Sequence, residues 1–259
     1  MGVIATNRGT IDVVEAGGGD ATPILFLHGV GSDHHVWAPQ VDHFSRERRA
    51  IAMAYPGYSG SVLVEHATRD DYAASVLAAM DALAIERAHI CGLSLGGVVA
   101  IALYAMAPAR CASLIIADSF AVHPDGQGIY DRSEAASRTI GMRALAEARV
   151  DILLGSAAAP AVRHAVIDTM SAISPAAYVL GARAVWLADQ RDRAAAIEVP
   201  TLVLVGDEDV ITPPALSEQL AALIPVAKLA IIPGAGHLAN LEQPHAFNAA
   251  IDGFLSEID

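Results

Sequence analysis

The stretch that decides the fold is Ile90-Cys91-Gly92-Leu93-Ser94-Leu95-Gly96-Gly97. Gly92 and Gly96 stand two residues on either side of Ser94, in the pattern G-x-S-x-G. When a strand turns into a helix within one or two residues, the central side chain is forced into a strained backbone conformation. Glycines on both sides let the neighbouring segments approach without a Cβ clash. The pattern therefore predicts that Ser94 sits at a sharp strand-to-helix turn, the geometry of a nucleophile elbow.

The flanking sequence supplies the strand and the helix that such a turn needs. Residues 87–91 form a short, mostly apolar run, and residues 95–107 are rich in Ala, Val, Ile and Leu and stop before Pro108. This is the strand–turn–helix context of the motif. The chain contains 21 glycines, so the pattern taken alone also fits an ordinary glycine-rich loop. The rest of the sequence therefore has to distinguish a nucleophile elbow from an ordinary loop.

The amino-acid composition restricts the classes of protein to which this chain can belong. The 259 residues are 54% apolar and 17% charged, enough for one large α/β domain or two small ones. The net charge of −13 argues against a nucleic-acid partner. The sequence shows no secretory leader, and no uninterrupted apolar run approaches the roughly 18 residues that span a bilayer. With only two cysteines, both beside apolar runs, we expect a cytoplasmic protein with no membrane partner, and homo-oligomerisation stays open.

Apolar runs and helical periodicities alternate along most of the chain. A hairpin followed by strands that alternate with helices predicts an α/β fold with a mostly parallel, eight-stranded sheet covered on both faces. The expected strands are 3–6, 10–15, 23–27, 50–54, 87–91, 113–117, 201–205 and 228–232, and the expected helices outside the long insertion are 36–44, 70–85, 95–107, 213–223 and 244–258.

One long segment breaks this alternation. Between Phe120 and Val199 there is no convincing strand, and helical patterns cover 132–149, 161–170 and 175–189. We therefore expect a core formed by residues 1–120 and 200–259. Residues 121–199 are expected to form a helical cap inserted into that core.

A serine hydroxyl needs a base, and the base needs an orienting acid. Among ten histidines, His237 stands out because it follows the last expected strand. Asp209, in the loop after strand 201–205, is the preferred acid because it gives the chain order serine, acid, histidine. Asp118, at the end of strand 113–117, is the rival. The backbone N–H groups of Leu95 and Val30 are candidates for an oxyanion hole.

Together these motifs resemble the α/β-hydrolase superfamily. The resemblance covers nearly the whole chain, and within the superfamily several stretches look like 3-oxoadipate enol-lactone hydrolases. Those lactonases often lack the pair His28-Gly29, which is present here as in general esterases. The stretches that carry the likeness are His28-Gly29, Tyr55–Gly60, the Ser94 motif, Gly206–Asp209 and Gly236-His237 for the superfamily, and Ser32–Gln40, Cys91–Gly97, Ala188–Arg191, Ile197–Thr201, Thr212–Pro214 and His237–Glu242 for the lactonases.

The resemblance implies a serine hydrolase that acts on small carboxylic esters or lactones through an acyl-enzyme on Ser94. Carbon–carbon bond hydrolysis, perhydrolysis and a non-catalytic small-molecule receptor remain alternatives. Neither an organic cofactor nor a metal is expected, since no His, Cys or carboxylate cluster has ligand spacing. His28, Gly29 and Trp186 are candidates for substrate contact, although Trp186 also fits plain packing between cap and core.

The cap supplies further candidates for the substrate pocket. An inward-facing arginine would favour a substrate with a carboxylate, such as an enol-lactone acid, whereas a pocket without one would suit a neutral ester. Each arginine taken singly is more simply read as a solvated residue on a helix surface. The candidates are Tyr130, Met142, Tyr178 and Trp186 for the apolar lining, and Arg132, Arg138, Arg143 and Arg183 for the carboxylate.

Overall fold

Eight strands form a single sheet in the computed structural model, which describes residues 2–259. The spatial order is β1-β2-β4-β3-β5-β6-β7-β8. Among these strands only β2 runs in the direction opposite to the other seven, so the predicted mostly parallel sheet is confirmed. The strands are β1 (Gly2–Thr6), β2 (Gly9–Ala16), β3 (Ile24–Leu27), β4 (Ala50–Met53), β5 (Ala88–Leu93), β6 (Cys111–Ala117), β7 (Thr201–Gly206) and β8 (Ala227–Ile232).

The side chains of the sheet alternate between two apolar cores, one on each face. On β3, Leu25 and Leu27 belong to one core, whereas Ile24 and Phe26 belong to the other. This alternation follows from the period of two in a strand. Because both faces are covered, β3 reads in the sequence as a continuous apolar run.

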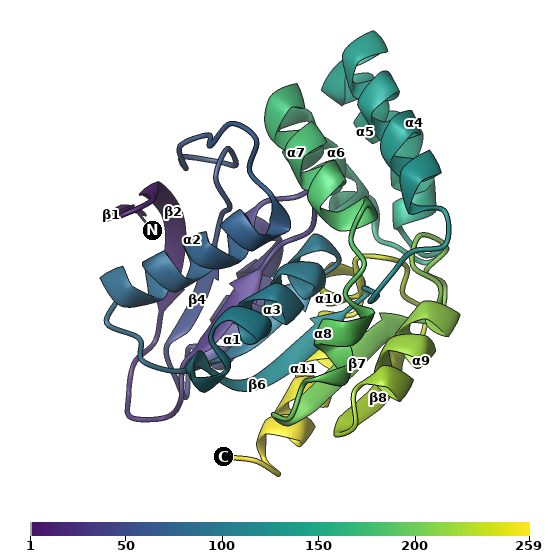
Figure 1. Cartoon of the computed structure of the whole chain (residues 1–259). Helices are drawn as coiled ribbons and strands as arrows, with labels where there is room; N and C mark the ends of the chain where they lie inside the picture. Colours follow the sequence, from purple (N-terminus) through teal and green to yellow (C-terminus); the bar gives the residue numbers. More distant parts are fainter. Residues whose placement is uncertain (1) are drawn as a thin grey trace.

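Helices cover both faces of the sheet (Figure 1). Buried residues of α2, α3 and α9 join the core that contains Leu25, and those of α1 and α11 join the core that contains Phe26. These helices and the short ones near them are η1 (His34–Trp37), α1 (Ala38–Phe44), α2 (Arg69–Ala82), α3 (Leu95–Met106), η2 (Pro108–Arg110), α9 (Pro214–Leu223), α10 (Ala239–Glu242) and α11 (Pro244–Leu255).

A helical insertion lies between β6 and β7, and Figure 1 shows its longer helices gathered at one end of the sheet. The single helix expected over 132–149 is wrong, because Gly141 adopts a φ of +76° and separates two helices there. The expected helix 175–189 ends earlier, at Trp186, and α8 was not anticipated. The insertion consists of α4 (Gly126–Thr139), α5 (Gly141–Leu153), α6 (Pro160–Ala172), α7 (Pro175–Trp186) and α8 (Arg191–Ala195).

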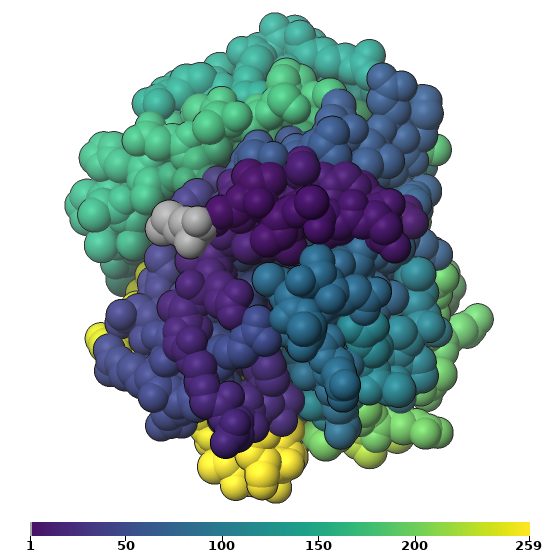
Figure 2. Space-filling model, turned by 90° about the vertical axis from the view of Figure 1, so that its left-hand side faces the viewer, coloured from purple at the N-terminus to yellow at the C-terminus, as the bar shows by residue number. Residues whose placement is uncertain are grey.

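The N-terminal strands form the edge of the sheet (Figure 1). Figure 2 looks onto this edge and shows the purple N-terminal segment between the helical insertion above and the yellow C-terminal residues below. Among residues 2–259 no single helix is long and apolar enough to cross a bilayer. Only α6 and α7 taken together reach that length and apolarity, and they are bent by 105° where they meet.

The register of the sheet places four loops next to one another at the carboxyl ends of the parallel strands. Leu27 is paired with Gly92, so the loop after β3 emerges beside the turn after β5. Gly206 is paired with Ile232, so the loops after β7 and β8 also lie side by side. These are the loops that hold the candidate site residues.

The turn at Ser94 has the predicted strand–turn–helix geometry. β5 ends at Leu93, α3 begins at Leu95, and Ser94 between them has a φ of +53° and a ψ of −112°. A Cβ on Gly92 would lie 2.2 Å from the carbonyl carbon and oxygen of Gly96. A Cβ on Gly96 would lie 2.0 Å from the carbonyl oxygen of Leu27. Both glycines are therefore required by backbone atoms that cannot move aside.

We predict that Gly96→Ala lowers the free energy of unfolding by about 3 kcal/mol or more, because the new methyl group overlaps a strand carbonyl in a packed core. Urea denaturation measures this change. Gly253→Ala in α11 is the matched control, since its Cβ meets nothing within 4 Å and alanine favours the helix by about 0.5–1 kcal/mol. Equal stability of the two variants would contradict the packing described for the turn.

Candidate active site

Three predicted side chains meet above the carboxyl ends of the strands. The Oγ of Ser94 lies 3.0 Å from Nε2 of His237, and Nδ1 of His237 lies 2.8 Å from Oδ2 of Asp209. All three residues are buried, and they come from the turn after β5 and the loops after β8 and β7. This is the order of contacts that a serine, a general base and an orienting acid require.

The carboxylate of Asp209 is held by four donors. Its Oδ1 accepts hydrogen bonds from the backbone N–H groups of Ile211 and Thr212, and its Oδ2 accepts one from the hydroxyl of Thr212 in addition to that from His237. Burial alone raises the pKa of Asp209, but His237 and the hydrogen bonds from Thr212 outweigh it and lower the pKa to about 2. The group is therefore ionised at neutral pH. Sequence reasoning quoted Thr212 only as part of a motif and missed its contact with the carboxylate.

Asp118, the rival acid, lies elsewhere in the network. It is fully buried, and its Oδ1 accepts a hydrogen bond of 2.9 Å from the backbone N–H of Gly206. Burial, followed by the nearby charge of Asp209, raises the pKa of Asp118 well above its usual value. Among the described contacts it makes none with His237, so the geometry favours Asp209 as the partner of the histidine.

The buried side chain of His28 packs against the loop after β3. The side chain of His28 is fully buried, its Nδ1 lies 2.8 Å from the carbonyl oxygen of Gly29, and its Nε2 accepts a hydrogen bond from the backbone N–H of Tyr55. Burial lowers the pKa of His28 to about 4, which keeps the ring neutral. His28 is not among the residues that line the serine cavity, so its predicted contact with substrate is corrected to a role under the loop.

The two candidate oxyanion donors are at the start of α3, directly after Ser94, and on the loop after β3. Leu95 is the first residue of α3, so its N–H has no acceptor within the helix. Val30 lines the same cavity as Ser94. A Cβ on Gly29 would be 3.4 Å from Cβ of Ser94, which shows how closely this loop approaches the serine. The Tyr58 hydroxyl lies 3.1 Å from the carbonyl oxygen of Val30 and 3.2 Å from that of Ala177, and so connects this loop to α7.

The cavity at Ser94 is small and mostly apolar. Its volume is about 180 Å³, and Gly29, Tyr178 and Trp186 line it as expected. Trp186 also stacks on Phe120, with 5.7 Å between the ring centroids, so it packs as well as lining the cavity. Tyr130 and Met142 are not among the lining residues.

The four arginines proposed from the sequence do not line this cavity. Arg132, Arg138 and Arg143 form ion pairs with neighbouring carboxylates, and Arg183 is exposed. The cavity wall instead contains Arg149, which the sequence analysis missed. The sequence did not indicate that Arg149 faces the cavity. A single helix was predicted over 132–149, but the break at Gly141 changes which face of α5 turns inward.

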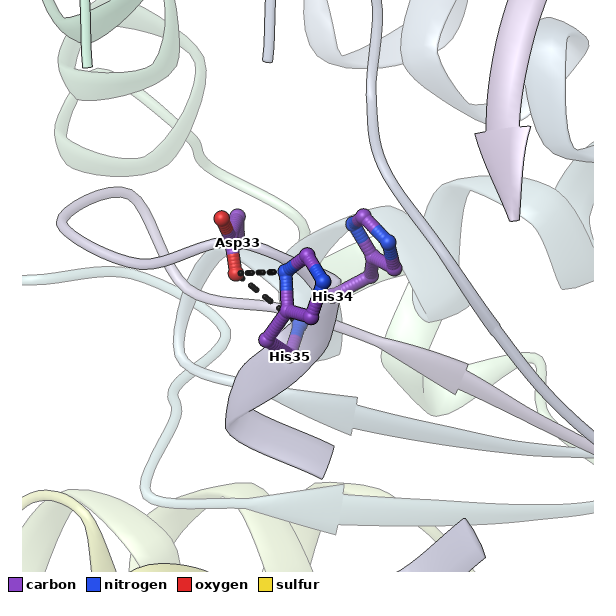
Figure 3. A group of neighbouring side chains, drawn as sticks. All are labelled: Asp33, His34 and His35. Carbon is purple, nitrogen blue, oxygen red and sulfur yellow. Dashed lines mark hydrogen bonds and ion pairs between the residues drawn. The ribbon is translucent and has the colours of Figure 1, made fainter. Parts of the chain in front are cut away.

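Asp33, His34 and His35 bring together three side chains of types that can bind a metal ion, a grouping that the sequence analysis did not anticipate (Figure 3). One ligand atom from each lies within 4.8 Å of the others. Oδ1 of Asp33 accepts a hydrogen bond from the backbone N–H of His35, and its Oδ2 accepts one from the Ser59 hydroxyl. Asp33 thus caps η1, and this capping role accounts for its position.

The insertion is tied to the histidine loop by Glu242. Its Oε2 accepts a hydrogen bond of 2.6 Å from the N–H of Gly155, and its Oε1 accepts one of 3.0 Å from the N–H of Gly236. The N–H of His237 donates to the carbonyl oxygen of Leu153 at 2.9 Å. One carboxylate and one backbone bond therefore join the α5–α6 connection to the segment that positions His237.

Comparisons with known proteins agree with this geometry. The sequence pattern of the alpha/beta hydrolase family matches residues 24–250, and the chain belongs to this family. It is 30% identical to 3-oxoadipate enol-lactonase 1 of Acinetobacter baylyi, over 99% of this chain and 97% of that protein.

Two solved structures have folds that closely match this one. The enol-lactonase from Burkholderia xenovorans LB400 superposes with a TM-score of 0.92 at 28% identity, covering 98% of this chain and 100% of that one. A thermophilic esterase from Thermogutta terrifontis reaches 0.91 at 28% identity, covering 99% and 98%. The resemblance inferred from the motifs is thus confirmed: the chain is an α/β hydrolase whose homologues include esterases and lactonases.

We predict that Glu242→Ala costs about 2–4 kcal/mol in the free energy of unfolding, since it leaves two amides without their acceptor. Glu242→Gln retains one carbonyl acceptor and is expected to lose about half as much. Urea denaturation gives both values. Glu257→Ala is the control, because within residues 2–259 its exposed carboxylate pairs only with Lys228, and such a surface pair is worth less than about 1 kcal/mol. If all three variants were equally stable, Glu242 would not join the two loops.

Proposed function

We propose that the protein is a serine hydrolase of small carboxylic esters or lactones. The observation that carries this proposal is the hydrogen-bonded chain from Ser94 through His237 to Asp209. An ionised, fourfold-bonded Asp209 fixes the His237 ring with Nε2 toward the serine, as a general base requires. The names of the relatives, which include enol-lactonases and esterases, favour this substrate class.

The mechanism follows from the roles of these groups. Ser94 Oγ attacks the carbonyl carbon while His237 Nε2 takes its proton, and the N–H groups of Val30 and Leu95 hold the oxygen that becomes negative. His237 then gives the proton to the leaving oxygen as the carbon–oxygen bond breaks. A water molecule, deprotonated by His237, releases the acid from Ser94. In a lactone the leaving oxygen stays attached to the acyl group, so acylation opens the ring.

The cavity favours a small substrate. Its volume of about 180 Å³ lies below the range of about 300–1,000 Å³ that is usual for ligand pockets, and its walls are mostly apolar. We propose that residues 121–199 act as the cap that closes this cavity. An activity like that of 3-oxoadipate enol-lactonase is the specific form of the proposal. Its support is the similarity to 3-oxoadipate enol-lactonase 1 and to a solved structure named as an enol-lactonase.

The test is hydrolysis of p-nitrophenyl acetate, p-nitrophenyl butyrate and a muconolactone-derived enol-lactone, with fluorophosphonate labelling followed by intact mass. Ser94→Ala is expected to lose labelling and about 10⁶-fold in kcat. Asp209→Asn is expected to lose about 10⁴-fold. Asp118→Asn is the matched control for Asp209→Asn. Asp118 makes no contact with His237, and burial raises the pKa of its carboxyl group.

Each outcome has a distinct meaning. Fastest turnover of the enol-lactone supports the lactonase form, and turnover of the simple esters alone leaves a general esterase. Equal, negligible rates in the wild type and Ser94→Ala, with no labelling, would overturn the hydrolase and point to a small-molecule receptor on the same fold.

A further inference from the structure

The candidate oxyanion residue Val30 is held through both of its peptide units. Its N–H shares one peptide unit with the carbonyl of Gly29. That carbonyl oxygen lies 2.8 Å from Nδ1 of His28 and accepts a hydrogen bond of 3.2 Å from the Ser32 hydroxyl. Because a trans peptide unit is planar, these contacts also fix the direction of the Val30 N–H, which points to the opposite side. The next peptide unit is held through the Val30 carbonyl oxygen, to which the Tyr58 hydroxyl donates at 3.1 Å.

The two supports of Val30 belong to different parts of the molecule. His28 and Ser32 lie on the same loop as Val30, whereas Tyr58 lies between β4 and α2, and its hydroxyl is also 3.2 Å from the carbonyl oxygen of Ala177 in α7. Within a helix such a carbonyl already faces an N–H four residues further on. Among the contacts described for residues 2–259, no other donor reaches the Val30 carbonyl oxygen. Tyr58 is therefore the polar link between Val30 and α7.

A glycine in α7 allows this close approach. A Cβ on Gly181 would lie 2.2 Å from the Tyr58 hydroxyl oxygen and 2.9 Å from Cγ2 of Val30. Glycine inside a helix is less favourable than alanine, so its presence here is explained by the space that the hydroxyl needs. The same helix supplies Tyr178 and Trp186 to the wall of the serine cavity. The hydroxyl that holds Val30 is thus packed against a helix that lines the substrate space.

Tyr58 acts on this loop and not on the substrate. Its side chain is only 1% exposed, and Tyr58 is not among the described residues that line the serine cavity. Burial raises the pKa of the Tyr58 hydroxyl well above its usual value, so the group keeps its proton and remains a donor at neutral pH.

We propose that Tyr58 is a positioning residue that couples α7 to the oxyanion donor of Val30. The inference rests on the proposed function and adds a means by which the helical insertion controls the same site. Contact of a substrate with the cavity wall on α7 is passed through the hydroxyl to the Val30 carbonyl, and the Val30 N–H is then held where the negative oxygen forms. Because this N–H is needed in the transition state and not for substrate binding, its loss of alignment lowers kcat and not affinity.

The test compares Tyr58→Phe with the wild type in the hydrolysis of p-nitrophenyl acetate. The variant removes only the hydroxyl, and kcat is expected to fall about 10- to 30-fold with KM within about twofold. Loss of a whole oxyanion donor costs about 10²- to 10³-fold, and here the donor is displaced but still present. Inhibition by butylboronic acid, which forms a tetrahedral adduct with a reactive serine, is expected to weaken by the same factor as kcat.

Tyr72→Phe is the matched control. The Tyr72 hydroxyl is also buried but has no hydrogen-bond partner in the described structure, and its ring stacks on Tyr55 with 5.0 Å between the centroids. Phenylalanine keeps this stacking, so kcat, KM and inhibition by the boronic acid are expected to stay at wild-type values.

A double variant separates the hydrogen bond from packing. In Tyr58→Phe combined with Gly181→Ala, the new methyl group fills the space that the hydroxyl left, and alanine favours the helix. Urea denaturation is expected to show that the double variant is at least as stable as Tyr58→Phe, while kcat stays low. Recovery of kcat in the double variant would show that the hydroxyl matters only for its volume, and would overturn the inference.

The remaining outcomes distinguish the inference from the proposed function. An active wild type with an unchanged kcat in Tyr58→Phe, or with an equal fall in Tyr72→Phe, would overturn the inference and leave the hydrolase intact. A rise in KM at constant kcat would do the same, because it would place Tyr58 in substrate binding. A wild type that neither hydrolyses the ester nor reacts with a fluorophosphonate would overturn the proposed function, and the inference with it.

Discussion

The structure depends on one strained residue held between strand and helix. Ser94 adopts a φ of +53°, which a non-glycine residue tolerates only where its surroundings leave no alternative. Here the alternatives are removed by close backbone packing, because Gly92 lies against Gly96 and Gly96 lies against the end of β3. The Ser94 N–H is bonded to Ala117 on β6, and its carbonyl accepts from the Ser119 hydroxyl. The serine is thus fixed by three neighbouring strands before any substrate arrives.

The helical insertion forms part of the candidate site as well as covering it. Glu242 and the bond from His237 to Leu153 join the α5–α6 connection to the histidine loop, while Tyr58 joins α7 to the loop of Val30. The same insertion supplies Tyr178, Trp186 and Arg149 to the cavity wall. In this arrangement the helices that shape the substrate space also position the groups we propose for the chemistry.

The sequence predicts the core well because local and global signals agree there. Buried strands read as apolar runs, and the glycines around Ser94 have a steric reason that is visible in the motif. Prediction fails where orientation depends on packing. The break at Gly141 changes which face of α5 turns inward, so Arg149 was missed and exposed arginines were proposed. The contact of Thr212 with Asp209 and the burial of His28 likewise depend on the fold of their loops.

The most direct test of the account is a crystal structure of the protein after reaction with a fluorophosphonate. The account predicts phosphorus bonded to Oγ of Ser94, with the phosphoryl oxygen about 3 Å from the backbone nitrogens of both Val30 and Leu95. An adduct on another residue, or a phosphoryl oxygen that faces away from those two N–H groups, would contradict the assignment of the serine and its oxyanion donors.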